Sequence, residues 1–151
     1  SQPATVRFAT PICFEDTIPA ICQRMIYDRT GRKRADLLIN QTNDGWYTTS
    51  SEPWQHLQIA TLRCVELRVP MARSVNTGVS AFIDANGRIQ HILEVRHQPQ
   101  QVSGVATQTL TLDPRTTLFG YLGETPMWCL AGLTGALTLW TLRPRKKRLL
   151  P

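Results

Sequence analysis

The sequence has no C-x-x-C pair, and none of its three histidines stands at metal-ligand spacing from a cysteine. A zinc site is therefore not expected, and no cofactor or other metal is predicted. A complete set of disulfides is not expected either, because Cys129, one of four cysteines, lies inside a long apolar run. Internal repeats and low-complexity tracts are also missing, and 151 residues suffice for one globular domain with a real core.

No secretory signal precedes the first apolar run, since the sequence shows neither a basic n-region nor an apolar h-region there. The chain begins with Ser1 and reaches that run within a few residues, so we expect the sequence to start partway through a longer protein. A membrane or periplasmic location would then be encoded upstream of Ser1 or at the other end of the chain.

The positive charge is concentrated at the C-terminus. The formal net charge is +6, and five positive charges belong to the last nine residues: Arg143, Arg145, Lys146, Lys147 and Arg148. The rest of the chain is close to neutral. A cluster at one terminus indicates a local partner, either nucleic acid or anionic lipid.

Residues 125–142, directly before this basic tail, contain no charged side chain. As a helix they would span about 27 Å, near the lower limit for a bilayer core of about 30 Å. Trp128 and Trp140 lie near the two ends, where aromatic rings favour the membrane interface. A buried core helix is the alternative. The tail favours a transmembrane helix with a cytoplasmic C-terminus, and it removes the reason to expect nucleic acid.

The preceding residues alternate between strand and helix patterns. A short strand is predicted over 6–13, then a helix from Thr17 to Gly31, and then a strand over 35–40 that is buried on both faces. A long polar loop follows. Ser51 and Pro53 open a second helix, whose core positions are Leu57, Ala60, Cys64 and Leu67.

After Pro70 the pattern changes to strands. Strands are predicted over 71–75, 79–84, 88–95 and 102–112, and Asn86-Gly87 forms the strongest hairpin signal in the chain. The order of elements indicates a layered α/β domain whose sheet continues into antiparallel hairpins.

Cys13 ends the first predicted strand and is followed by a loop and a helix. A nucleophile in this position stands at a sheet edge, next to backbone N–H groups that can serve as oxyanion donors. Only about 3% of an ordinary thiol is ionised at pH 7, so a base or cation has to assist it. The alternative is a cysteine that packs as a small apolar side chain.

Five segments around and after Cys13 occur in one order: PICFED (11–16), LINQTNDGWY (38–47), PWQHLQIA (53–60), RCVE (63–66) and RSVNTGVSA (73–81). Together they closely resemble the C-terminal half of the catalytic domain of the apolipoprotein N-acyltransferase family, in the nitrilase superfamily. The resemblance runs from about Val6 to the end of the chain. It implies part of a nitrilase-like α-β-β-α sandwich followed by one C-terminal transmembrane helix.

The resemblance also implies an activity and its partners. In that family a cysteine takes an acyl chain from a membrane phospholipid as a thioester. The acyl chain then passes to the N-terminal diacylglyceryl-cysteine of a lipoprotein. The implied location is the bacterial inner membrane, with a periplasmic catalytic domain. The implied domains are a catalytic part (1–115), a juxtamembrane connector (116–124), the membrane helix (125–142) and a cytoplasmic tail (143–151).

Three site roles follow from the resemblance. Cys13 matches the nucleophile, Glu15 an acidic position needed beside it, and Phe14 a position where the family commonly has tyrosine. The backbone N–H of Phe14 is the expected oxyanion donor. The residues expected to bind substrate or brace the site are Asn43, Asp44, Trp46, Arg73 and Asn76. Asn43, Asp44 and Trp46 have the alternative of capping and packing a loop, and Asn76 has the alternative of serving a turn. His56 is expected to be a helix-surface or hydrogen-bonding histidine rather than a base.

The family's glutamate base and its lysine lie upstream of the cysteine, and only twelve residues without an acid or a lysine precede Cys13 here. The remaining lysines are Lys33 in a basic turn, and Lys146 and Lys147 in the tail. None matches the family's position, so the fragment alone is expected to be inactive. A soluble nitrilase-type amidase and a non-catalytic nitrilase-like remnant are the alternative functions.

Overall fold

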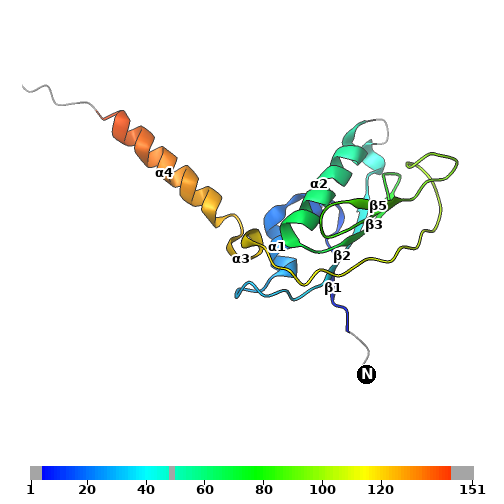
Figure 1. The fold of residues 1–151 in the computed structure, drawn as a ribbon. Coiled ribbons are helices and arrows are strands. Elements are labelled where there is room, and N and C mark those ends of the chain that lie inside the picture. Colours follow the sequence, from blue (N-terminus) through cyan, green and yellow to red (C-terminus); the bar gives the residue numbers. More distant parts are fainter. Residues whose placement is uncertain (1–4, 48–49, 144–151) are drawn as a thin grey trace, which may run out of the picture.

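The computed structural model of the chain describes residues 5–47 and 50–143. These residues form an α/β domain from which one long helix extends (Figure 1). The α/β class predicted from the sequence is therefore confirmed.

Five strands form one mixed sheet in the order β1-β2-β3-β4-β5. Strands β1 (Phe8–Ala9), β2 (Leu37–Asn43) and β3 (Met71–Asn76) are parallel. Strands β4 (Ala81–Ile83) and β5 (Ile89–Ile92) continue the sheet in antiparallel pairing. The predicted change from parallel strands to hairpins is thus present in the described part of the chain.

Two helices connect the parallel strands. Helix α1 (Pro19–Ile26) follows the 3₁₀ turn η1 (Cys13–Thr17), and α2 (Glu52–Leu67) follows the short turn η2 (Gly45–Tyr47). Each α-helix has a proline in its first turn, where the missing N–H costs no intrahelical hydrogen bond.

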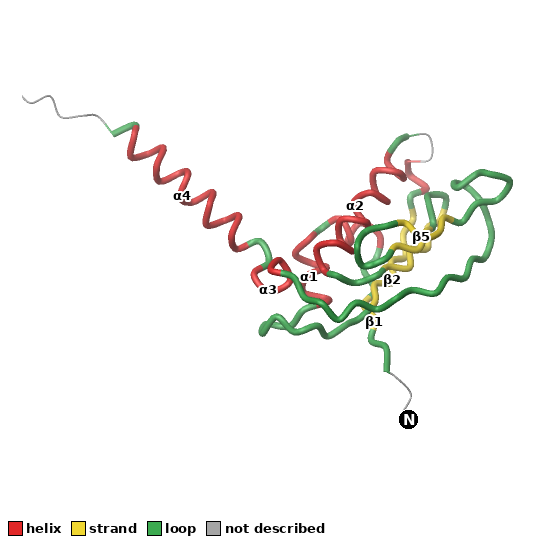
Figure 2. Tube along the Cα trace, viewed as in Figure 1, coloured by secondary structure: helices red, strands yellow, loops and turns green. Residues whose placement is uncertain are grey.

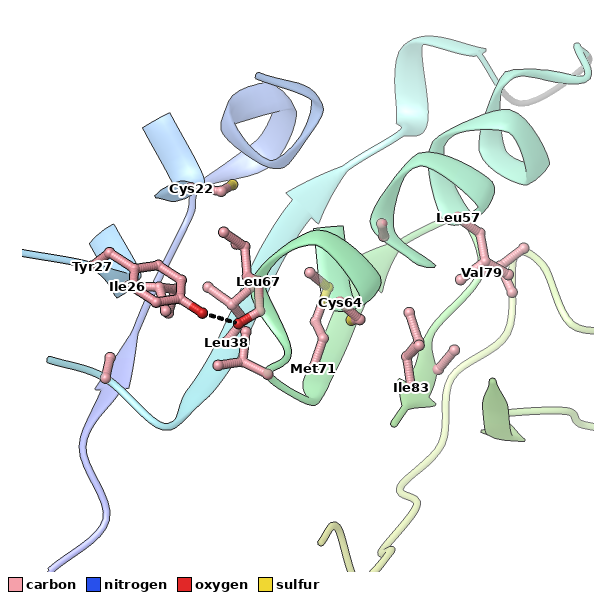
Figure 3. Packing of buried hydrophobic residues seen from close by; sticks show 14 residues of the cluster. Cys22, Ile26, Tyr27, Leu38, Leu57, Cys64, Leu67, Met71, Val79 and Ile83 are labelled. Carbon is pink, nitrogen blue, oxygen red and sulfur yellow. Dashed lines mark hydrogen bonds between the residues drawn. The ribbon is translucent and has the colours of Figure 1, made fainter. Parts of the chain in front are cut away.

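The core lies between these two helices and one face of the sheet (Figure 3). All four predicted core positions of α2 are buried, and the sheet supplies Leu38, Met71, Ala81 and Ile83. Burial of one large aliphatic side chain contributes about 1.5–3 kcal/mol. The Tyr27 hydroxyl, also buried, donates a hydrogen bond of 2.8 Å to the carbonyl of Leu67 and ties the end of α1 to the end of α2.

The hairpin between β4 and β5 turns at the predicted Asn86-Gly87 pair. Gly87 has φ +78°, a left-handed conformation that costs glycine nothing. A Cβ on Gly87 would also lie 2.6 Å from Cγ2 of Val65 and 3.0 Å from the carbonyl oxygen of Thr61. Glycine is therefore needed here both for the backbone conformation and for the close approach to α2.

Three predicted elements differ from the structure. Helix α1 ends at Ile26 rather than at Gly31, because the Asp28 carboxylate accepts hydrogen bonds from the N–H groups of Thr30 and Arg32 and closes a turn. Strand β2 extends to Asn43 and is fully buried on one face only.

Residues 102–112 form no strand, although their alternating pattern predicts one. They belong to a long extended segment between β5 and α3 (Leu118–Leu122), which is drawn as loop in Figure 2. Most of their side chains are exposed, and no neighbouring strand in the described residues pairs with them. An extended segment becomes a strand only when a partner satisfies its N–H and C=O groups.

Helix α4 (Thr125–Thr141) extends away from the α/β part (Figure 1). None of its residues is buried, and its large apolar side chains, such as Trp128, Leu137 and Trp140, are 52–71% exposed. No helix in the described part of the chain is both long enough and apolar enough to cross a membrane. The transmembrane helix predicted over 125–142 is thus not confirmed, and the tail beyond Arg143 lies outside the described residues.

Candidate active site

The candidate site lies where the three parallel strands end. Ile12, just before Cys13, pairs with Gln41 of β2 in a parallel bridge. Asp44 follows the last residue of β2, and Asn76 is the last residue of β3. The carboxyl ends of parallel strands meet at one sheet edge, which is the usual place for a ligand site in such sheets.

Cys13 is held in an unusual backbone conformation at this edge. Its φ is +52°, in the left-handed region that residues other than glycine rarely adopt. The side-chain amide of Asn40 fixes the turn by donating to the carbonyl oxygens of Pro11 (3.1 Å) and Cys13 (3.3 Å). Conformations of this kind concentrate at functional sites, where the surrounding structure enforces them.

The thiol of Cys13 is half-buried, and its surroundings lower its pKa. A hydrogen bond from Thr42 Oγ1, 3.4 Å from Sγ, is the main cause, and it outweighs the opposing effect of burial on the pKa. The N–H groups of Asn43 and Phe14 lower this pKa further. Burial instead raises the pKa of Cys22 to about 12, and it also raises that of Cys64. Cys13 is therefore the cysteine suited to act as a nucleophile.

A buried cluster of charged side chains lies behind Cys13. His56 Nε2 is 2.7 Å from Asp16 Oδ1, and His56 Nδ1 is 3.2 Å from Asp44 Oδ1. Arg73 donates through Nη1 to Asp16 (2.8 Å) and to Asn40 Oδ1 (2.8 Å), and through Nη2 to Asp44 (3.3 Å). The carboxylates of Asp16 and Asp44 thus face two cationic groups inside the domain, which avoids the large cost of an unpaired buried charge, and Glu52 Oε1 lies 3.6 Å from His56 Nδ1 at the edge of the cluster.

His56 carries a positive charge in this cluster. A neutral imidazole has one N–H donor, but both nitrogens of His56 face carboxylate oxygens. Burial lowers the pKa of His56, but the hydrogen bonds to Asp16 and Asp44 outweigh it and raise the pKa to about 9. The ring also stacks on Phe14, with a centroid distance of 4.9 Å and an interplanar angle of 6°. His56 thereby holds the turn that carries Cys13.

The sequence of the chain matches the carbon-nitrogen hydrolase family model over residues 4–114. The chain belongs to this family. The relatives it matches include the apolipoprotein N-acyltransferases of Shewanella oneidensis (38% identity, 76% of this chain and 22% of the relative) and Chlorobaculum tepidum (38% identity, 89% and 23%). The chain spans about a fifth to a quarter of the length of such relatives. The predicted resemblance is confirmed.

Solved structures of the same family resemble the chain more weakly. A carbon-nitrogen hydrolase from Helicobacter pylori aligns with a TM-score of 0.47 at 15% identity, over 62% of this chain and 37% of that one. A CN-hydrolase superfamily protein from Xanthomonas campestris aligns with a TM-score of 0.48 at 20% identity, over 85% and 46%.

The predicted site residues of this carbon-nitrogen hydrolase chain divide into two groups. Cys13, Phe14, Asp44 and Arg73 come together in and around the buried cluster. Glu15 lies beside them, and its carboxylate accepts the N–H of Ile12 at 2.8 Å. In the structure Glu15 thus stabilises the turn around Cys13, while its expected role as a supporting acid remains a prediction.

The other predicted residues lie at the rim. Asn43 and Asn76 are exposed and joined by a hydrogen bond of 3.1 Å from the Asn76 amide to Asn43 Oδ1. Asn43 Oδ1 also accepts the N–H of Gly45 at 3.0 Å. Trp46 is 84% exposed and points into solvent. These three residues can meet a ligand at the entrance. The backbone N–H of Asp44 donates to the carbonyl oxygen of Asn76 at 3.2 Å, but no side chain of the three forms a hydrogen bond with the buried cluster in the described residues.

Sequence reasoning missed Asp16, Asn40 and Thr42, and it left the burial of His56 open. A signal was available for β2. Asn40, Thr42 and Asp44 alternate with other residues, so they share one face of the strand, and all three are buried there. Polar residues at every second position of a buried strand indicate a polar network. Asp16 and His56 carried no comparable pattern, because only the packing of α2 on η1 brings them together.

Three residues of this region carry side chains that can bind a metal ion. The donor atoms of Asp44, Glu52 and His56 lie within 4.8 Å of one another. A nitrogen that binds a metal must give up its proton, whereas both nitrogens of His56 are engaged with carboxylates. The three residues are better explained as part of the ion-pair cluster.

Lys33 does not belong to the site. Its ammonium group donates to the carbonyl oxygens of Arg68 (2.5 Å) and Asp113 (2.7 Å). Lys33 and Arg68 precede β2 and β3, so they lie at the opposite end of the sheet from Cys13. This distance from Cys13 agrees with the expectation that Lys33 does not replace the family's lysine.

Proposed function

We propose that the chain is the nucleophile-bearing part of an N-acyltransferase that acts on bacterial lipoproteins. The observation that carries the proposal is the Cys13 thiol, which lies at the carboxyl ends of the parallel strands with a lowered pKa. The relatives named apolipoprotein N-acyltransferase supply the reaction class, with 33–42% identity over most of the chain.

In the proposed reaction, the Cys13 thiolate attacks the ester carbonyl of a phospholipid acyl chain. The S–C bond forms, the C–O bond breaks, and a lysophospholipid alcohol leaves with a proton. The amino group of the lipoprotein's N-terminal diacylglyceryl-cysteine then attacks the thioester, which regenerates the thiol and gives an amide. The N–H of Phe14 would stabilise the tetrahedral oxyanion in both steps.

The base and the cation of this chemistry are proposed to come from outside the 151 residues. The resemblance assigns them to a glutamate and a lysine upstream of the cysteine, and the twelve residues before Cys13 contain neither. The chain spans only about a fifth to a quarter of its relatives, which leaves room for both groups in a longer protein.

The location proposed for this protein is the bacterial inner membrane. Helix α4 supports the proposal, because its apolar side chains are exposed along its whole length and would otherwise face water. Within this proposal residues 1–115 form the catalytic part in the periplasm, residues 116–124 connect it to the apolar segment 125–142, and residues 143–151 form a cytoplasmic tail.

The test is mass spectrometry of the intact protein that also carries the glutamate and the lysine, after incubation with phospholipid. The parent protein should gain one acyl mass. Cys13→Ser should gain none, because an alcohol ionises far less readily than a thiol and is a poorer leaving group. Cys22→Ser and Cys64→Ser change buried, unreactive thiols and should keep the adduct.

An adduct that persists in Cys13→Ser would refute the assignment of the nucleophile. Release of free fatty acid or hydrolysis of a small amide, without transfer to the lipoprotein amine, would instead favour the soluble amidase function. A parent protein that never acquires the acyl mass would favour the non-catalytic remnant.

A further inference from the structure

Thr42 joins the thiol of Cys13 to the buried charge cluster. Thr42 lies on β2 and is 8% exposed, on the same face as Asn40 and Asp44. Its Oγ1 atom is 3.4 Å from Cys13 Sγ and 2.9 Å from Asp44 Oδ1. These distances place one hydroxyl within hydrogen-bond reach of both a nucleophile and a carboxylate.

The hydroxyl of Thr42 has a single proton, so it cannot donate to both neighbours at once. When Cys13 is a thiol, its S–H can donate to Thr42 Oγ1, and Thr42 can donate to Asp44. When Cys13 is a thiolate, the sulfur can only accept, and the proton of Thr42 is needed there. The preferred direction of the hydroxyl therefore depends on the ionisation of Cys13.

Asp44 can lose the hydrogen bond from the Thr42 hydroxyl and still keep two hydrogen-bond partners. Its Oδ1 keeps His56 Nδ1 at 3.2 Å, and its Oδ2 keeps Arg73 Nη2 at 3.3 Å. A buried carboxylate with no remaining partner would resist the change strongly. Because Asp44 keeps these two cationic partners, rotation of the Thr42 hydroxyl away from it has a low cost in free energy.

We propose that Thr42 is a positioning residue for Cys13, whose hydroxyl donates to Asp44 while Cys13 is a thiol and turns to Sγ when Cys13 becomes a thiolate. The thiolate is thereby stabilised and held at the carboxyl end of the sheet. The catalytic meaning of this contact rests on the proposed function of Cys13 as nucleophile, but the contact itself can be tested without any substrate.

The charged and titratable groups around this pair come from every neighbouring element. They are Glu15 and Asp16 on η1, Asp44 after β2, Glu52 and His56 on α2, and Arg73 on β3. None of them is changed when Thr42 is replaced. The N–H groups of Asn43 and Phe14, which also lower the pKa of Cys13, remain as well. A shift on replacing Thr42 would thus report on its hydroxyl.

The experiment compares Thr42→Val, which keeps the shape without the hydroxyl, with Thr42→Ser, which keeps the hydroxyl. The rate of Cys13 alkylation by iodoacetamide is measured against pH in the whole chain, by mass spectrometry of the Cys13 peptide. One hydrogen bond to a charged group stabilises it by about 1.5–3 kcal/mol, so valine should raise the midpoint by about one to two pH units. Serine should restore a midpoint close to that of the parent.

Folding is checked in the same samples, because Cys22 and Cys64 are fully buried and stay unreactive only while the domain is folded. Thr42→Ala removes the hydroxyl without adding apolar bulk, and it should raise the midpoint as valine does. An unchanged midpoint in either variant, or a serine variant that behaves like valine, would overturn the proposal. A midpoint that depends on the hydroxyl, in a protein that never forms an acyl adduct, would refute only the proposed function.

Discussion

The charge on His56 makes a pH-dependent contribution to stability that can be measured. The pKa of His56 rises from 6.5 to about 9 on folding. At about 1.4 kcal/mol per unit, this shift corresponds to roughly 3.5 kcal/mol. A pKa raised by folding stabilises the protein fully below the unfolded value of 6.5, and the stabilisation is lost as the pH rises through 9.

The perturbation is His56→Gln, which leaves Asp16 and Asp44 buried with Arg73 as their remaining cationic partner. Removing one partner from a buried ion cluster costs about 3–5 kcal/mol. We expect the variant to be less stable than the parent by about that amount at pH 6. The difference should shrink by about 3 kcal/mol between pH 6 and pH 10, because the parent loses the charge of His56 over this range.

The assay is denaturant unfolding of the whole chain at a series of pH values, followed by circular dichroism. His91→Gln is the matched control, because His91 is exposed and has no charged partner among its contacts in the described residues. Its stability difference from the parent should be small. A His56→Gln curve that runs parallel to the parent curve from pH 6 to pH 10 would refute the charged state of His56.

Two further predictions concern the hairpin and the membrane. Gly87→Ala should cost about 1–3 kcal/mol in the free energy of unfolding, because alanine is strained at φ +78° and its Cβ would meet Val65. Gly132→Ala in α4 is the control, since a Cβ there meets nothing within 4 Å and alanine favours a helix, so no loss of stability should accompany it. A topology reporter fused after Pro151 should be active in the cytoplasm, and activity in the periplasm would contradict the proposed orientation.

Members of the buried cluster, together with Glu15, support separate parts of the turn that carries Cys13. Asn40 holds the backbone of Cys13, His56 holds the ring of Phe14, and Glu15 holds the N–H of Ile12. These three contacts surround Cys13, whose φ lies in the left-handed region. A mutation in any one of them should therefore affect the position of the thiol before it affects the fold as a whole.

Local pattern was sufficient for much of the fold. Helix α2 follows from a proline in its first turn and from apolar residues at helical spacing, and the β4–β5 hairpin follows from Asn86-Gly87 between two β-prone runs. These signals are local because their hydrogen bonds join residues that are close in sequence. Cys13 could also be predicted as the candidate nucleophile, since a strand that ends at a cysteine and the five ordered segments are visible in the sequence alone.

Tertiary structure alone decided which polar residues surround the thiol. Asp16, His56 and Arg73 come from η1, α2 and β3, and only the packing of α2 on η1 and the parallel register of β2 and β3 unites them. Likewise, 102–112 alternates like a strand, but no strand among residues 5–47 and 50–143 pairs with it. The sequence by itself determined the local elements, because these depend on near neighbours in the chain, and it singled out Cys13 as the candidate nucleophile. The charge state of His56 and the surroundings of Cys13 depend on contacts between distant residues, which exist only in the folded domain.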